Sequence, residues 1–197
     1  MLYSMTIRLV AISLLFTGAA LCDAKADDLK DSPSATLKHI QDVGAKAFLR
    51  EFSGDMSKFG TLLEHIGRGN SDWLKVANEI IPATDAIYSE TLEMALGEAV
   101  EHHPDQVFLL VPRLDVAPWS VEEVCTSLEI DDENHTDDLD IARLERRVVA
   151  LRKISRSPLA NRCGQAIEAA IHKLKRKNIT ESGTEASTAT RSSAPSR

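Results

Sequence analysis

The sequence predicts an all-α fold, an orthogonal or solenoid-like bundle of about seven short helices with one disulfide. Apolar residues recur at spacings of three and four along most of the chain, which is the period of an amphipathic helix. Capping residues and prolines precede these segments, and glycine or proline follows several of them. Two cysteines lie on apolar stripes far apart in the chain, where a bridge would join two of the helices.

The first three helices are predicted from their ends. Ser32-Pro33 opens a helix over residues 33–52, because serine caps a helix and proline suits its first position. A second helix over residues 56–66 stops at Gly67-Arg68-Gly69. A third begins at Asn70 or Ser71, carries Trp73 and Leu74 as core residues, and ends before Pro82.

The later helices follow the same signals. Thr84-Asp85 caps a longer helix that runs to about residue 102. Residues 104–111 are read as a short buried helix and not as a strand, since a lone strand would have no partner. Ser120 opens a short helix with a capping box, residues 139–154 carry a further apolar stripe, and Ser157-Pro158 opens the last helix, to about residue 177.

Composition excludes several classes of protein. The chain has 197 residues, 43% of them hydrophobic and 27% charged, which fits one globular domain with appendages and excludes a collagen-like, fully disordered or multi-pass membrane protein. The formal net charge of −7 gives the whole molecule no attraction for nucleic acid. We therefore expect no nucleic-acid partner.

Residues 1–26 have the pattern of a cleaved secretory signal peptide. Arg8 supplies the positive charge, residues 9–21 the apolar core, and Ala24-Lys25-Ala26 the cleavage site. The apolar core is shorter than the roughly 20 residues that span a bilayer, so no stable membrane insertion is expected. Lipid attachment at Cys22 is disfavoured, because the large and small residues before it are in reversed order. The predicted location is the periplasm or the external medium, and the family resemblance described below implies that the organism is a bacterium.

The mature chain is expected to have three parts. Residues 27–31 are a polar, disordered lead-in, residues 32–177 a single all-α domain, and residues 178–197 a disordered tail rich in Ser, Thr and Ala. Removal of the signal leaves Cys125 and Cys163, an even pair in an oxidising compartment, and a disulfide between them is the default. Two buried thiols or a nucleophile are the alternatives, and no His or Gly-rich turn near either cysteine favours the second.

One stretch of the domain has a family resemblance. The segments GNSDWL (69–74), ATDA (83–86) and SETL (89–92), followed by His103-Pro104, are similar to a group of small uncharacterised exported bacterial proteins. That group has Gly where this chain has Ala83, and Asn where it has His103. The resemblance implies an exported helical protein and no particular activity.

Three charged clusters are candidate metal-binding or partner-binding sites. Glu98 and His102 share a helix face and are the best metal candidate, but a closed site needs three or four ligands, which favours a polar helix end. Residues 129–140 contain seven acids without the register of an EF-hand, which favours a solvated loop whose last acids lie at the start of the next helix. Weak cation binding or an acidic patch for a partner is the alternative.

The third cluster is basic. Residues 143–177 hold eleven Lys or Arg against two Glu, in an otherwise acidic protein. These charges either line the solvent faces of two helices or form a surface for an anionic partner. The candidate partner surface consists of Arg143, Arg146, Arg147, Arg152, Lys153, Arg156, Lys173 and Lys175.

No catalytic motif is present. The chain lacks Gly-x-Ser-x-Gly, His-Glu-x-x-His, a P-loop and a dinucleotide fingerprint, so no cofactor, metal or catalytic residue is assigned. The sequence predicts a non-enzymatic, exported helical protein that serves as an interaction or accessory module of the cell envelope, with an envelope protein as its partner. An immunity or inhibitor protein against an envelope-acting toxin or hydrolase, and a hydrolase without a recognisable signature, are the alternatives.

Overall fold

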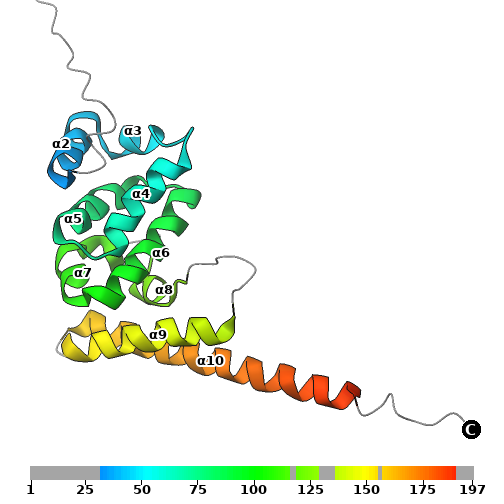
Figure 1. Cartoon of the computed structure of the whole chain (residues 1–197). Helices are drawn as coiled ribbons and strands as arrows, with labels where there is room; N and C mark the ends of the chain where they lie inside the picture. Colours follow the sequence, from blue (N-terminus) through cyan, green and yellow to red (C-terminus); the bar gives the residue numbers. More distant parts are fainter. Residues whose placement is uncertain (1–31, 116–118, 129–135, 155–156, 190–197) are drawn as a thin grey trace, which may run out of the picture.

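The fold is built from helices alone in the part of the chain that the structure describes. The computed structural model describes residues 32–115, 119–128, 136–154 and 157–189, and these contain α-helices and short 3-10 helices but no strand (Figure 1). The predicted all-α class is confirmed. The expected signal peptide (1–26) and lead-in (27–31) lie outside the described residues.

The described elements follow one another through short connections. The α-helices are α2 (Pro33–Val43), α3 (Ala45–Arg50), α4 (Met56–Gly67), α5 (Ser71–Ile80), α6 (Ala86–His102), α7 (Pro104–Leu110), α8 (Val121–Thr126), α9 (Asp137–Leu151) and α10 (Pro158–Ala189). The 3-10 helices are η1 (Ile81–Ala83), η2 (Pro112–Asp115) and η3 (Arg152–Ile154).

Side-chain caps start these helices where the sequence predicts. The Ser32 hydroxyl accepts a hydrogen bond from the Ala35 amide at the start of α2, and the Asp85 carboxylate accepts one from the Tyr88 amide at the start of α6. Ser120 and Glu123 form the predicted capping box of α8, in which each side chain binds the backbone amide of the other residue. The predicted short helix after His103 is also confirmed, as α7.

Two helix boundaries differ from the prediction. The segment expected as one helix over 33–52 is divided at Gly44, whose φ of +85° is a conformation that glycine adopts at little cost. The last helix, expected to end near residue 177, runs to Ala189, into the segment predicted as a disordered tail. No proline interrupts residues 178–189, and although Asn178 and Gly183 are residue types that often end a helix, extending a formed helix is easier than starting one.

The helices stack in two layers. In one layer α4 contacts α6 and α6 contacts α9, while in the other α2 contacts α5, α5 contacts α7, and α7 and α8 contact α10. Figure 1 shows the stack running from α2 and α3 at one end to the α9–α10 pair at the other. This succession of helix pairs is the solenoid-like arrangement that the sequence predicts. No described helix combines the length and apolar character needed to cross a membrane.

One hydrophobic cluster runs through the whole stack. Trp73 and Leu74 of α5 are buried in it, as predicted, and the Trp73 indole stacks on the His65 ring of α4. The largest fully buried side chains include Phe59, Ile66, Leu74, Ile80, Leu92, Leu96, Leu144 and Ile167. The core therefore joins elements from α2 to α10 into one domain.

The predicted disulfide holds α8 against α10. Cys125 and Cys163 are bonded, and both side chains are fully buried. Beside the bridge, the Arg162 guanidinium of α10 donates two hydrogen bonds to the Glu122 carboxylate of α8, at 2.7 and 2.8 Å. Covalent and ionic links at neighbouring positions therefore fix the short helix α8, which is only six residues long.

Candidate functional site

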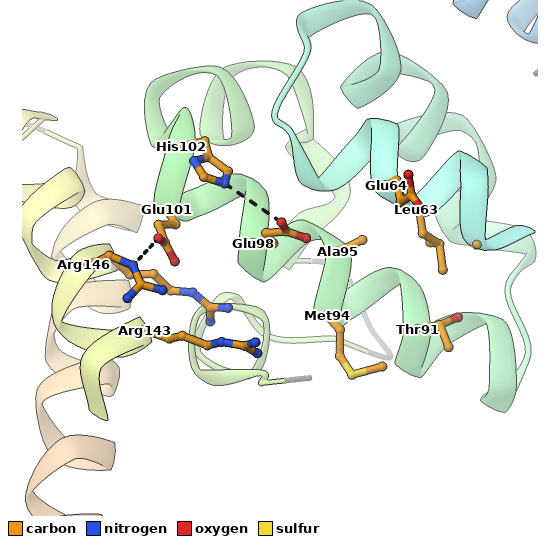
Figure 2. A pocket seen from close by; sticks show the side chains of 12 residues that line it. Leu63, Glu64, Thr91, Met94, Ala95, Glu98, Glu101, His102, Arg143 and Arg146 are labelled. Carbon is orange, nitrogen blue, oxygen red and sulfur yellow. Dashed lines mark hydrogen bonds and ion pairs between the residues drawn. The ribbon is translucent and has the colours of Figure 1, made fainter. Parts of the chain in front are cut away.

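A surface groove lies on the layer formed by α4, α6 and α9. It encloses a cavity of about 560 Å³. In Figure 2, α6 lies between α4 and α9, and the labelled side chains come from all three helices. We call this cavity the groove, with α6 as its floor and α4 and α9 as its two walls.

The floor is one face of α6. Thr91, Met94, Ala95, Glu98 and His102 line the groove at spacings of three and four, which places them on the same side of the helix. The predicted core stripe of α6, which includes Leu92, Leu96 and Ala99, is buried. The groove face of α6 is apolar at its Met94 end and charged at its His102 end.

The α4 wall approaches the floor most closely at Gly67. A Cβ atom at this position would stand 2.5 Å from the Glu98 carboxylate oxygen Oε2, so only glycine leaves room for that side chain as it lies. Gly60, Leu63 and Glu64 form the remainder of this wall. Leu63 extends the apolar part of the floor, and Glu64 places a carboxylate at the rim.

The α9 wall contributes arginines. Arg143, Arg146 and Arg147 all line the groove. Arg146 forms an ion pair with Glu101 of α6, whose side chain is only 17% exposed. This pair ties the α9 wall to the floor at the charged end of the groove (Figure 2).

Arg147 is buried behind the groove surface. The residue is 4% exposed, and its Nη1 donates to the carbonyl oxygens of Cys125 and Ser127, at 2.8 and 2.7 Å, at the end of α8. Burial lowers the pKa of Arg147 to about 10, against the opposing effect of Glu101, so the group stays cationic at neutral pH. Its Nε has no hydrogen-bond partner in the part of the chain that the structure describes.

The predicted basic partner surface is therefore divided. Including Arg147 in it is wrong, because this residue lies on the same face of α9 as the buried Leu144 and Leu151 and holds α8 in place. Arg143 and Arg146 are brought together at the groove. The other predicted residues, Arg152, Lys153, Lys173 and Lys175, are exposed outside the groove, and Arg156 lies outside the described residues.

Part of the remaining positive charge is paired with acids of α9. Lys175 of α10 lies 2.9 Å from a carboxylate oxygen of Glu145, and Lys177 lies 3.1 Å from one of Asp137. Asp137 and Asp138 stand in the first turn of α9 behind the Thr136 cap, as predicted for the last acids of the acidic segment, whose residues 129–135 lie outside the described residues. Lys175 and Lys177 therefore lie on the solvent face of α10 beside acids of α9, in line with the expectation that some of these charges line the solvent faces of two helices.

The metal candidate from the sequence is part of the groove. His102 Nε2 and Glu98 Oε1 are 4.0 Å apart, and both side chains are exposed. Among the described residues no three or more His, Cys, Asp or Glu side chains are grouped as metal ligands. The pair is thus placed to contact a charged or polar group in the groove.

Sequence reasoning did not find the groove as a unit. The sequence singles out Glu98 and His102, and separately the arginines of α9, but not Leu63, Met94 or Thr91 as site residues. A signal was present in the second stripe of α6, at residues 91, 94, 95, 98 and 102, which has both apolar and charged members. What such a stripe faces depends on helices far away in the sequence.

The lining of the groove combines apolar, acidic and basic side chains. Thr91 carries the one hydroxyl group among its lining residues, and this hydroxyl donates to the backbone carbonyl of Ile87 at 3.1 Å. The other lining groups offer apolar contact, carboxylates and guanidinium groups.

Comparison of the chain with protein-family models, curated proteins and solved structures finds no match.

Proposed function

We propose that the protein is a non-enzymatic interaction module that docks a segment of a partner protein in the groove between α4, α6 and α9. The observation that carries the proposal is the hollow itself, which has a floor that is apolar at its Met94 end and charged at its His102 end, charged rims, and successive helices of one layer as its sides. Stacked helix pairs commonly use such surfaces to bind other proteins.

The openness of the groove supports a polypeptide and not a small molecule. Of its lining residues only Ala95 and Arg147 are buried, and the others are partly or fully exposed. Small ligands are typically enclosed over about 70–90% of their surface, which such an open site does not provide. A segment of another protein lying across the floor would cover the same residues and exclude water from them.

We further propose that this module works in the periplasm or outside a bacterial cell. The signal-like pattern of residues 1–26 and the Cys125–Cys163 bridge support this location, since disulfides persist in oxidising compartments. The expected partner is a protein of the same compartment.

Site-specific photo-crosslinking tests the docking site. A benzophenone amino acid is placed at Thr91 in the groove, or at Leu109 of α7, which is 71% exposed and does not line the groove. In living cells the Thr91 position should give a crosslinked product of defined mass, and the Leu109 position should not. The captured protein is then purified and tested for 1:1 binding to the unmodified chain.

A second variant pair tests the contact without crosslinking. Met94→Arg places a bulky charge on the apolar floor and should abolish binding of the captured protein, whereas Leu109→Arg adds the same charge elsewhere and should leave binding intact. Equal crosslinking from both positions, or unchanged binding by Met94→Arg, would refute the groove as the docking site. A captured toxin or hydrolase that loses activity on binding would identify the module as an inhibitor.

A further inference from the structure

Charges of opposite sign stand on opposite sides of the groove. The arginines that line it, Arg143, Arg146 and Arg147, all belong to the α9 wall. The carboxylates belong to the other two helices, with Glu64 on the α4 wall and Glu98 and Glu101 on the floor. Figure 2 shows Arg143 and Arg146 across the groove from Glu64, with α6 between them. An occupant that lies along α6 therefore meets positive charge along one edge and negative charge along the other.

The rim charges are accessible to an occupant. The Arg146 side chain is 55% exposed, and a guanidinium group has five N–H donors, of which the Nε–H is directed at Glu101. The Glu64 side chain is 69% exposed and lies 3.7 Å from Arg68 within its own helix. The exposed pair of Glu64 with Arg68 contributes little to stability, so Glu64 can bind a second partner at low cost, and Arg146 can do so through donors other than its Nε–H.

The backbone chemistry of the groove favours a helical occupant. Its lining consists of side chains on three helices, and the described residues contain no sheet edge to which an extended peptide could add. A segment that satisfies its own backbone hydrogen bonds, as a helix does, fits such a surface best. The floor from Thr91 to His102 is about 17 Å long at 1.5 Å per residue, which is about three turns of helix.

We propose that the docked segment is an amphipathic helix with acidic residues along one edge and basic residues along the other. This proposal rests on the proposed function and adds the chemistry of the partner segment. The apolar stripe of the segment packs on Met94, Ala95 and Leu63, its acidic edge faces Arg143 and Arg146, and its basic edge faces Glu64 and Glu98. Glu101 and Arg147, which are largely buried, keep the wall and floor in position.

A peptide selection tests this chemistry without knowledge of the natural partner. The probe is a phage-displayed library of helix-forming 16-residue peptides with a fixed apolar stripe, in which the positions along both edges vary among Glu, Gln and Lys. It is panned against the purified exported chain and against three charge variants, Arg146→Glu, Glu64→Lys and Lys173→Glu. Lys173 is exposed on α10 and does not line the groove, so its variant is the matched control.

The expected result is a two-sided preference. The unmodified chain should enrich peptides with Glu on one edge and Lys on the other about tenfold over the all-Gln peptide, because each exposed ion pair contributes up to about fivefold. Arg146→Glu should change the preferred residue on the first edge from Glu to Lys. Glu64→Lys should change it on the second edge from Lys to Glu, and Lys173→Glu should change neither.

The outcomes separate this inference from the proposed function. Because Arg146→Glu opposes Glu101 and could unfold the chain, Arg146→Gln is panned in parallel and should remove the preference on the first edge without reversing it. Equal enrichment of the all-Gln peptide would overturn the charge pattern. The helical occupant would be overturned if no peptide is enriched more strongly on the unmodified chain than on the Met94→Arg variant. In either case the crosslink at Thr91 decides independently whether the groove docks a protein.

Discussion

Adding one methyl group at Gly97 of α6 tests how tightly the groove floor is packed against the rest of the domain. A Cβ atom at Gly97 would stand 2.5 Å from Ser127 Oγ, 2.7 Å from the Val124 carbonyl oxygen and 3.1 Å from Arg147 Nη1. Because the Val124 oxygen belongs to the backbone of α8, no side-chain rotation relieves this contact. Gly97→Ala therefore forces α8 away from α6.

The magnitude follows from three contributions. Overpacking a close contact typically costs about 1–3 kcal/mol. Moving α8 also strains the one hydrogen bond that the Ser127 hydroxyl donates, which is shared between the carbonyl oxygens of Glu93 and Val124 and is worth about 1 kcal/mol. The higher helix propensity of alanine offsets about 1 kcal/mol of this loss in the free energy of unfolding. We expect Gly97→Ala to lower the free energy of unfolding by about 2 kcal/mol, which in a domain of this size lowers the Tm by about 4–8 °C.

Gly164→Ala in α10 is the matched control. A Cβ atom at Gly164 would have no atom within 4 Å, so this variant gains helix propensity without a clash. It should raise the free energy of unfolding by about 0.5–1 kcal/mol. Both variants are compared with the unmodified chain by thermal melts and urea titrations under oxidising conditions. If Gly97→Ala melts at or above the unmodified chain, or if both variants shift in the same direction, the packing argument is refuted.

Three further predictions concern the disulfide, the buried arginine and a half-buried acid. Removing the bridge between Cys125 and Cys163, which are 38 residues apart, should lower the free energy of unfolding by about 4 kcal/mol, and mass spectrometry that finds two free thiols in the native protein would contradict the bridge. Arg147→Met keeps the apolar stem but leaves two carbonyls of α8 without their donor, so it should cost about 2–4 kcal/mol, and an unchanged urea midpoint would contradict this role. Burial, and after it the charge of Glu123, raises the pKa of Glu93 above its ordinary value of 4.5. The stabilisation that the protonated carboxyl contributes is therefore present below pH 4.5 and is lost as the pH rises through the folded-state pKa. Glu93→Gln should therefore raise the Tm at pH 7 but not at pH 4, and an equal shift at both values would show that the carboxyl is not perturbed.

Local signals predicted most of the secondary structure. The caps at Ser32, Asp85 and Ser120 and the apolar stripe of α6 depend on residues within one or two turns of each other, so they are visible in the sequence. The division at Gly44 and the continuation of α10 beyond residue 177 were missed. In the first case a continuous apolar period conceals a glycine with positive φ, and in the second a polar composition suggests disorder although no proline ends the helix.

The candidate site could be predicted only in fragments. The positive charge of Arg143, Arg146 and Arg147 is obvious from the sequence, and so is their spacing on one helix. Their different roles are not, because Arg147 shares a face with Leu144 and is buried, while Arg146 reaches across to Glu101, 45 residues away in the chain.

The sequence by itself determined that this protein is all-α, where most of its helices begin, and that Cys125 and Cys163 are the two cysteines to be joined. These properties follow from spacing, capping and the number of cysteines left after the expected signal, all of which are local or additive. Tertiary structure alone decided that α4, α6 and α9 share one layer, that a groove opens along α6, and that arginines and carboxylates face each other across it. The physical reason is that a helix has several faces, and packing against distant helices selects which of them is buried and which is left to bind.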